Sequence, residues 1–496
     1  MSLKHLKQIL TSEQTREADK QVIDSQSISS LELMERASTV FIDSIKDEIS
    51  KSDKICICCG TGNNGGDGLA VSRILQSEGY QVATFLIKIN DNLSKDCQAN
   101  FDRLENVKII NSKEDLPHFA EIDIIIDAIF GSGLTRPIEG LAAEVVQAIN
   151  FSKKKVLSID VPSGMYADKL SDSEIIVKSY LTVSFQRPKL SFFFPENSIY
   201  LNKWMVADIG LDENYIQSLS SSYFLLDKSI ENWAKSRQRF SHKGTYGHAL
   251  IIAGSYGKMG AAVLASKACL RSGVGLISTY VPKVGYNIMQ TSIPEAMCLT
   301  DECEHFITRI PSISIYNAIG IGPGIGQNPE SKEALELLLK NANQPLVIDA
   351  DAINILAGDE KLKKLIPDNS VLTPHPKELE RLVGSWKNSE ERLQKQIEFA
   401  KKHTCIVVLK DAYTSICDTN GNIYFNTSGN AGMATGGSGD VLTGIITGLL
   451  AQSYDPLFAA LIGVYFHGKA GDDAAKIKGQ NALIASDIIE HLRIGE

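Results

Sequence analysis

Three segments in the first half of the chain carry polar side chains suited to ligand binding and proton transfer. GTGNNGGDG covers residues 60–68, DAIFGSGLTRP covers residues 127–137, and SIDVPSG covers residues 158–164. Each follows an apolar run that is typical of a buried strand. Because the carboxyl ends of parallel strands face one crevice, we expect Asp127, Asp160 and Ser163 to converge beside the glycine-rich segment. The alternative is that each aspartate only caps a turn.

The glycine-rich segment matches the GxGxxG pattern of a dinucleotide turn, a pattern that is weak alone. An NAD dehydrogenase would carry an acidic residue at the end of the next strand, and QVATFLIKI offers only Lys88 there. Asn63, Asn64 and Asp67 add polar groups, and a carboxylate at a helix start competes with a phosphate for the same amides. The segment therefore predicts a more specific ligand than a pyrophosphate.

In the second half, ATGGSGD at residues 434–440 precedes the apolar, helix-like run VLTGIITGLLA. Glycines before a helix let backbone N–H groups turn inward and stabilise charge on a phosphoryl group in transfer. An aspartate at the edge of this nest can accept the proton of an attacking hydroxyl. The segment predicts phosphoryl transfer to an alcohol with Asp440 as base, in a sequence that has no GxxxxGK[ST] motif. The alternative is a helix cap with a favourable first-turn acid.

Five more segments of the second half carry groups suited to a nucleotide site. GPGIG lets a ligand approach the backbone, TPHPKEL fixes His375 between two prolines, and LKDAYT ends a strand with Lys410 and Thr414, which suit nucleotide phosphates. Each alone is more often structural, but their joint order is harder to dismiss: GSYGKMGAA (254–262), GPGIG (322–326), DADAIN (349–354), LTPHPKEL (372–379) and LKDAYT (409–414).

Alternating strand-like and helix-like patterns must position these groups. From Lys54 to about Gly210, β-rich runs alternate with helical spacing, which predicts a parallel sheet between helices; residues 13–48 precede it as one or two helices. Residues 212–224 lose periodicity and gather serine, so a boundary is expected there, with domains 1–218 and 219–496. A second α/β pattern follows. The sequence thus predicts an α/β protein of two domains.

Composition excludes several classes of function. The net charge is −9 and no dense basic run occurs, which argues against nucleic acid as a partner. No apolar span of 18 residues and no signal peptide are present, so we expect no membrane association and a cytoplasmic protein. Cys56, Cys58 and Cys59 fall in a run that reads as a buried strand, which favours core packing over a metal or redox role.

The three segments of the first half resemble the motifs of NAD(P)H-hydrate epimerase domains over most of residues 10–212. The resemblance implies a Rossmann-like fold, Asp160 as acid/base on the reacting ring, and a potassium ion held by Asn64, Asp127 and Ser163. Oxygen ligands suit such a hard cation. It also implies that these residues line the hydrated nicotinamide nucleotide: Asn63, Asn64, Gly65, Gly66, Asp67, Gly131, Ser132, Gly133, Leu134, Thr135, Arg136 and Pro137.

The ordered segments of the second half resemble ADP-dependent NAD(P)H-hydrate dehydratase domains, of ribokinase-like fold, over residues 225–493. The resemblance implies that Asp440 takes a proton from the substrate hydroxyl as it attacks the terminal phosphate of Mg²⁺-bound ADP. Family members more often have glycine where Asp411 stands, so we expect Asp411 to act through its backbone and to turn its side chain to solvent. The implied contacts are Ala261, Gly324, His375 and Asp440 for the hydrate, and Lys410, Asp411, Ala412, Tyr413, Thr414 and Gly439 for the nucleotide.

Together the resemblances imply a bifunctional isomerase and lyase for metabolite repair. It would interconvert the R and S hydrates of NADH and NADPH, and would dehydrate the S hydrate with ADP to give NAD(P)H, AMP and phosphate. Its expected partners are these small molecules, and it is expected to form a homo-oligomer. The alternative is a ribokinase-like small-molecule kinase fused to a non-catalytic nucleotide-binding module.

Overall fold

The computed structural model describes residue 3 and residues 6–495, and the chain divides into two compact units. The N-terminal unit comprises residues 8–221, and the C-terminal unit comprises residues 222–495 together with Leu6 and Lys7. The sequence places the boundary after residue 218, whereas the division follows Ser221. The strand β1 (Lys7–Gln8) lies at the edge of the second sheet, beside β9 (Tyr223–Leu226). Two residues carry no periodicity, so sequence patterning does not reveal this strand.

The described residues of the N-terminal unit form a seven-stranded parallel sheet in the order β4-β3-β2-β5-β6-β7-β8. The chain runs outward from β2 to β4, then returns to the other side of β2 and continues to β8. This is the predicted doubly wound arrangement, with its switch point between β2 and β5. The strands are β2 (Lys54–Cys59), β3 (Gln81–Ile87), β4 (Lys108–Ile110), β5 (Ile124–Ala128), β6 (Lys155–Ile159), β7 (Ser179–Phe185) and β8 (Leu201–Ala207).

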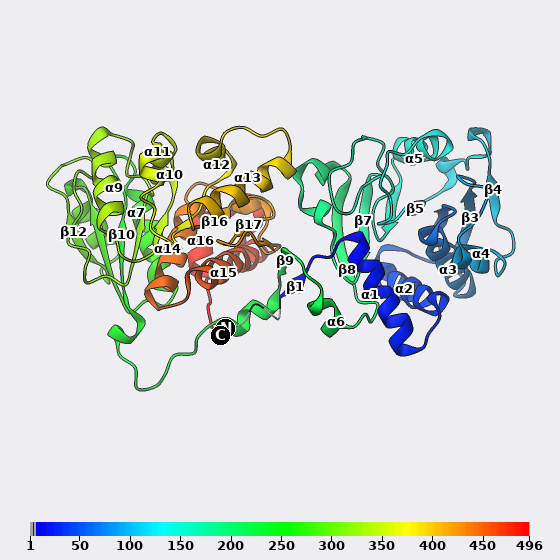
Figure 1. Ribbon diagram of the computed structural model, residues 1–496, viewed down its shortest axis with the longest axis horizontal. Coiled ribbons are helices and arrows are strands. Elements are labelled where there is room, and N and C mark those ends of the chain that lie inside the picture. Colours follow the sequence, from blue (N-terminus) through cyan, green and yellow to red (C-terminus); the bar gives the residue numbers. More distant parts are fainter. Residues whose placement is uncertain (1–2, 4–5, 496) are drawn as a thin grey trace. The chain divides into compact units, whose positions relative to one another are not determined.

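Helices cover both faces of this sheet, so the unit has the three layers that the sequence predicts (Figure 1). Ile55 and Ile57 of β2 pack with α2, α3 and α4, whereas Cys56 and Cys58 pack on the opposite face with α5. Burial of both faces explains why the strands read as continuous apolar runs. The helices are α1 (Ser12–Gln26), α2 (Ser30–Ile45), α3 (Asn63–Ser77), α4 (Lys95–Phe101), α5 (Gly140–Ser152) and α6 (Glu213–Ser218).

The C-terminal unit is built on an eleven-stranded sheet of described residues, in the order β1-β9-β18-β17-β16-β15-β14-β13-β10-β11-β12. The strands from β12 to β16 pair in parallel, and β17 is antiparallel to both of its neighbours. Its switch point lies between β10 and β13. The further strands are β10 (His248–Ile252), β11 (Leu276–Val281), β12 (Met297–Thr300), β13 (Ala318–Ile321), β14 (Leu346–Ile348), β15 (Val371–Leu372), β16 (Ile406–Leu409), β17 (Ser415–Cys417) and β18 (Ile423–Asn426).

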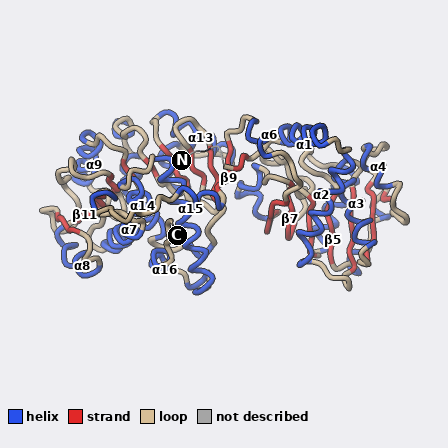
Figure 2. Tube along the Cα trace, turned by 90° about the horizontal axis from the view of Figure 1, so that it is seen from below, coloured by secondary structure: helices blue, strands red, loops and turns tan. Residues whose placement is uncertain are grey.

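Helices also flank the second sheet, as Figure 2 shows with strands in red between helices in blue. Residues of α7, α14, α15 and α16 pack with β10 in one core, which contains Ala249, Ile251 and Ile445. In the part of the chain that is described, no helix is long and apolar enough to cross a membrane. The helices are α7 (Met259–Arg271), α8 (Tyr286–Ser292), α9 (Pro329–Asn341), α10 (Ala350–Ala357), α11 (Glu360–Lys363), α12 (Pro376–Val383), α13 (Ser389–Lys402), α14 (Ser438–Ala451), α15 (Pro456–Lys478) and α16 (Ala485–Glu490).

Candidate active sites

A cavity of about 490 Å³ lies at the switch point of the N-terminal sheet. Its walls come from the segments that follow β2, β5, β6 and β7, together with α1, as expected for a doubly wound sheet. Pro137 lines a neighbouring cavity of about 500 Å³, and Gly65 and Gly66 are buried in the first turn of α3. The predicted residues that line the first cavity are Asn63, Asn64, Asp67, Gly131, Ser132, Gly133, Leu134, Thr135, Arg136 and Asp160.

The glycine-rich segment belongs to the helix itself, because α3 begins at Asn63. Helical spacing is evident in the sequence after Gly68, and close packing allows the helix to start earlier, at Asn63. A β-carbon on Gly65 would lie 1.8 Å from the carbonyl oxygen of Gly60. These glycines bring the first turn of α3 against the end of β2, and the amides of that turn face the cavity region.

Replacing Gly65 by alanine is expected to destabilise the N-terminal unit by about 1–3 kcal/mol, because a methyl group cannot fit against a backbone carbonyl. Ligand binding in the cavity should weaken with it, since the displaced turn carries Asn63 and Asn64. Gly62→Ala is the matched control: nothing lies within 4 Å of its β-carbon, and its φ of −91° suits any residue. Thermal unfolding of the two variants measures the difference, and equal melting temperatures would contradict the packing argument.

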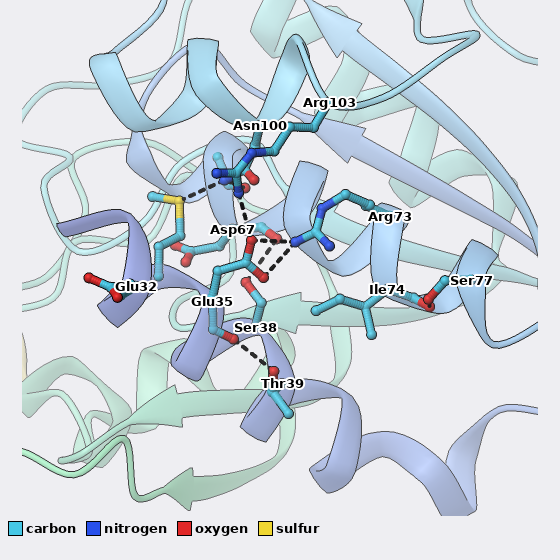
Figure 3. Close-up of polar contacts among 12 residues, drawn as sticks. Glu32, Glu35, Ser38, Thr39, Asp67, Arg73, Ile74, Ser77, Asn100 and Arg103 are labelled. Carbon is cyan, nitrogen blue, oxygen red and sulfur yellow. Dashed lines mark hydrogen bonds and ion pairs between the residues drawn. The ribbon is translucent and has the colours of Figure 1, made fainter. Parts of the chain in front are cut away.

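A cluster of polar side chains from α2, α3 and the end of α4 stabilises the first turn of α3. Figure 3 shows Glu35 ion-paired with both Arg73 and Arg103; its oxygen lies 3.0 Å from Nη1 of Arg103. The Nδ2 of Asn100 donates to the carbonyl of Gly66 at 3.4 Å, and the hydroxyl of Ser38 donates to the carbonyl of Asp67 at 3.3 Å. Side chains of α2 and α4 therefore hold the carbonyl groups at the end of the first turn of α3.

Asp160 is held in one orientation at the cavity wall. Its φ of +62° is a left-handed conformation that is uncommon for a residue other than glycine. The Nζ of Lys189 lies 2.7 Å from Oδ1, and the amide of Phe185 donates to the same oxygen at 3.1 Å. The Lys189 side chain is only 3% exposed, so this ion pair is buried. Sequence reasoning missed Lys189, although a lysine just after a strand is a possible signal.

Two more carboxyl groups accompany Asp160 at this cavity. Burial is the main cause that raises the pKa of Asp19 to about 6; the charge of Asp160 raises it further and Lys189 opposes the shift. Burial, with the nearby Asp160 and Asp19, also raises the pKa of Asp67 well above its usual value. Asp19 was missed because α1 reads from sequence as an ordinary amphipathic helix. The cavity thus combines carboxyl groups with different proton affinities.

The predicted potassium ligands lie around the end of β5. Asp127 is fully buried; its Oδ1 accepts from Ser163 Oγ at 2.5 Å, and its Oδ2 accepts from Ser158 Oγ at 2.9 Å. Ser163 Oγ in turn lies 3.2 Å from the carbonyl of Phe130. The side chain of Asn64 packs against Gly131, and its Nδ2 is buried without a partner among the described residues. The carboxylate of Asp127 and the hydroxyl of Ser163 are oxygen groups of the kind that bind hard cations, whereas the orphaned Nδ2 of Asn64 is a hydrogen-bond donor.

A second cavity of about 470 Å³ lies at the switch point of the C-terminal sheet. Of the predicted residues, Ala261, Gly324 and Asp440 line it together. Gly324 has a φ of +67°, and a β-carbon there would lie 3.2 Å from that of Ala261, so glycine is required by both conformation and space. Sequence reasoning did not single out five other lining residues: Lys258, Leu264, Asp351, Asn354 and Glu378.

The N-terminus of α14 carries the chemistry predicted for ATGGSGD. Gly437 precedes the helix with a φ of +90°, and Asp440 lies in the first turn. Among the described residues, the amides of Gly439 and Asp440 have no hydrogen-bond acceptor, so they are available to an anion. Lys410 Nζ lies 2.8 Å from Asp349 Oδ1 and 3.2 Å from where a β-carbon on Gly439 would stand. This end of the helix therefore presents amides, an ammonium group and a carboxyl group.

Asp440 has the proton affinity of a base that works near neutral pH. Burial is the main cause that raises its pKa to about 6; Asp349 and Asp351 raise it further, and Lys410 lowers it. The carboxylate of Asp349 is itself engaged by Lys410 and by the hydroxyl of Thr443, at 2.7 Å. A general base is most effective when its pKa lies close to the working pH.

His467 supports the same helix start from the neighbouring helix α15. Its Nε2 lies 3.0 Å from the carbonyl oxygen of Ser438. Burial lowers the pKa of His467 to about 4, so the ring is neutral at physiological pH. A neutral ring beside the glycine nest adds no charge of its own, and nothing in the sequence pattern marks this residue.

Two predicted contacts of the second site differ from expectation. Asp411 does not turn to solvent: its carboxylate pairs with Arg392 at 2.7 Å, which explains how an extra acid is tolerated near an anion site. His375 caps α12, with Nδ1 accepting from the Glu378 amide at 3.2 Å. Glu378 rather than His375 lines the cavity. The remaining predicted nucleotide residues, Ala412, Tyr413 and Thr414, follow Lys410 and Asp411 in the turn between β16 and β17.

Comparison with known proteins extends these observations. The family model described as NAD(P)H-hydrate dehydratase matches residues 249–493, and that described as YjeF-related protein N-terminus matches residues 30–191. A solved ADP/ATP-dependent NAD(P)H-hydrate dehydratase from Bacillus subtilis, co-crystallised with ATP and Mg²⁺, is 31% identical and covers 53% of this chain and 93% of that chain, with a TM-score of 0.46.

Two relatives match nearly the whole chain. The bifunctional NAD(P)H-hydrate repair enzyme Nnr of Moorella thermoacetica is 33% identical over 98% of this chain and 96% of its own length. The enzyme of the same name from Coxiella burnetii is 34% identical over 97% of this chain and 98% of its own length. Both matches span the two units and both cavities. The chain therefore belongs to the family of bifunctional NAD(P)H-hydrate repair enzymes.

Proposed function

We propose that this enzyme repairs hydrated NADH and NADPH in two steps. The N-terminal unit interconverts the R and S hydrates, and the C-terminal unit dehydrates the S hydrate with ADP to give NAD(P)H, AMP and phosphate. The observation that carries the proposal is that each sheet has a cavity at its switch point, and that the predicted acid/base residue, Asp160 or Asp440, lies in its wall. A small-molecule kinase fused to a non-catalytic module is disfavoured, because relatives matching both units share the bifunctional name.

Epimerisation at C6 requires proton transfer at the hydroxyl oxygen, whether the ring opens or the hydroxyl leaves. Asp160 serves as the acid/base, since its Oδ1 is fixed by Lys189 and Phe185 while the carboxyl group faces the cavity. Residues of α3 and of the 131–137 segment hold the nucleotide. A potassium ion at Asn64, Asp127 and Ser163 would fix the geometry of the segments that follow β2 and β5.

Dehydration in the C-terminal unit begins with attack of the C6 hydroxyl on the terminal phosphate of ADP. Asp440 accepts the hydroxyl proton, while the amides of α14 and the ammonium group of Lys410 stabilise the charge in transfer. Phosphate then leaves where hydroxide would not, driven by the ring nitrogen lone pair, and loss of a C5 proton restores the reduced nicotinamide. Ala261, Gly324 and His375 would contact the hydrate, and residues 410–414 with Gly439 the nucleotide.

Mg²⁺ enters this scheme as part of the nucleotide substrate. It binds mainly phosphate oxygens and water with one or two carboxylates, and does not need an all-protein cage. Among the described residues, no group of three or more His, Cys, Asp or Glu side chains is arranged to hold a metal.

The cysteines support a location in the cytoplasm. All nine are free thiols, and seven of them are buried. Free thiols persist in a reducing compartment. We expect the enzyme to act there on small molecules, without nucleic acid or membrane partners, and to form a homo-oligomer.

An assay with mixed R and S hydrates, ADP, Mg²⁺ and K⁺ tests both steps, because recovery of nicotinamide absorbance reports the final product. The wild-type chain should convert both hydrates. Asp160→Asn should stall once the S hydrate is consumed, with its epimerisation rate lowered by about 10²–10⁴-fold. Turnover of pure S hydrate should be unchanged, which is the internal control. Full conversion by Asp160→Asn at the wild-type rate would show that the N-terminal unit acts by other residues.

A further inference from the structure

The helix α1 contributes a wall of the first cavity through Thr15, Arg16 and Asp19. Of these, Asp19 is the one carboxyl group, and it shares the cavity with Asp160. We propose that Asp19 is a second catalytic residue of the epimerase, which exchanges a proton with the substrate in concert with Asp160. This inference rests on the proposed epimerase function and names a further group for it.

The chemistry needs two groups with opposite proton states. If the ring opens, a carboxylate removes the hydroxyl proton, the C6–O bond becomes a carbonyl, the C6–N1 bond breaks, and an acid protonates N1. If the hydroxyl leaves, an acid protonates it, water departs as N1 forms a double bond to C6, and water adds to the other face while a carboxylate takes its proton. Both routes start with one protonated and one ionised carboxyl group. When the ring closes again or water has added, both groups have returned to their starting protonation states.

The contacts of the two aspartates favour Asp19 as the protonated group. Asp160 has the buried ammonium group of Lys189 at 2.7 Å, with donors from Ser184 and Phe185 on the same oxygen. Among the described residues, Asp19 has no ion-pair or hydrogen-bond partner for its side chain. Its charged neighbours are Asp160, Asp67 and Lys189, and burial raises its pKa to about 6. A carboxyl group of raised pKa beside one that is ion-paired to a lysine can supply the acid and the base of one site.

The position of Asp19 is fixed by the contacts of α1. Thr11 caps the helix, and the hydroxyl of Ser12 donates to the carbonyl of Ser132 at 2.8 Å. The amide of Ser12 donates to Asp168 at 3.0 Å, and Val22 is buried in a core with residues of α2 and α6. The helix is therefore held against the 131–137 segment. The carboxyl group of Asp19 keeps a fixed position relative to this segment, which lines the same cavity.

The test uses the full chain and follows exchange between separated R and S hydrates without ADP, so the dehydratase is silent. Asp19→Asn should lower the kcat of epimerisation by about 10²–10⁴-fold with KM changed by less than about threefold. In the wild type, kcat/KM should fall as pH rises through about 6, because the protonated form of Asp19 is consumed. This fall in kcat/KM above about pH 6 should be absent from Asp19→Asn. Asp19→Glu should still show it, with a lower maximal rate. Asp24→Asn, an exposed acid on the same helix, is the matched control and should behave as wild type.

The outcomes separate this inference from the proposed function. If the wild type does not interconvert the hydrates, the epimerase proposal itself fails. If the wild type does so and Asp19→Asn keeps its rate and pH profile, only the role of Asp19 is overturned. A change confined to KM with an unchanged pH profile also overturns it, since that result assigns Asp19 to binding alone. Dehydration of S hydrate with ADP by each variant verifies that the chain is folded.

Discussion

Asp440→Asn is expected to lower the rate of ADP-dependent dehydration by about 10²–10⁴-fold while nucleotide binding is retained, because the variant keeps the shape of the site and loses its base. The wild-type rate should rise with pH through about 6, since only the ionised carboxylate accepts a proton and the pKa of Asp440 is raised to about 6. The variant should lack this rising limb. Single-turnover measurements with pure S hydrate, combined with ADP titration, separate the chemical step from binding.

The same substitution should stabilise the C-terminal unit. A carboxyl group whose pKa rises from 3.8 to about 6 on folding is destabilising in its ionised form, so the cost is present above about pH 6 and absent below about pH 4. Asp440→Asn should therefore raise the free energy of unfolding at pH 8 by about 1–3 kcal/mol, at roughly 1.4 kcal/mol per pKa unit. At pH 4 the gain should vanish. Hydrogen exchange of the amides in β10 and β13 reports on this unit alone.

A matched control makes the two effects specific to the cavity. Asp368 is an exposed acid of the same unit, so Asp368→Asn should change neither the rate nor the pH dependence of stability. If Asp440→Asn kept the wild-type rate, the phosphoryl-transfer step would need another base. If it lost activity without gaining stability at pH 8, burial of the charged carboxylate would not be the origin of its raised pKa.

The sequence predicts the sheet architecture well because strands buried on both faces are continuous apolar runs. Lys54–Cys59, Gln81–Ile87 and His248–Ile252 are such strands, and all three were expected. The strand Leu201–Ala207 was missed because it lies at a sheet edge and alternates with exposed residues. The helix start at Asn63 was missed because glycine has a low helix propensity, whereas tertiary packing against β2 requires glycine there.

The residues of the two candidate sites also divide into those that have a local sequence signal and those that have none. Residues next to glycine-rich turns, such as Asp160 and Asp440, were found because strand ends and helix starts have local sequence signals. Lys189 and Asp19 were not, because each lies in a stretch whose own pattern is ordinary, and Glu378 lies within LTPHPKEL, where only His375 was given a role. The pairing of Asp411 with Arg392, 19 residues away, likewise depends on packing of α13 against the end of β16. Such contacts need the three-dimensional structure.

Lys189→Met is expected to destabilise the N-terminal unit by about 3–5 kcal/mol, because it leaves the Asp160 carboxylate buried without its counter-ion. The ion pair is 3% and 11% exposed at its two side chains, so solvent screens it little. Epimerisation should fall at the same time, since the ammonium group also orients the acid/base. Hydrogen exchange of amides in β6 and β7, which flank the pair, measures the loss of stability, and R-to-S exchange measures the rate.

The double variant Asp160→Asn/Lys189→Met separates the electrostatic cost from a loss of packing. With both charges removed, no buried carboxylate remains unpaired, so most of the lost stability should return, whereas epimerisation should stay low for want of the acid/base. Lys88→Met, which removes an exposed lysine 3.7 Å from Asp91, should leave protection of β6 and β7 unchanged. A double variant as unstable as Lys189→Met would mean that the methylene chain of Lys189, rather than its charge, maintains this wall of the cavity.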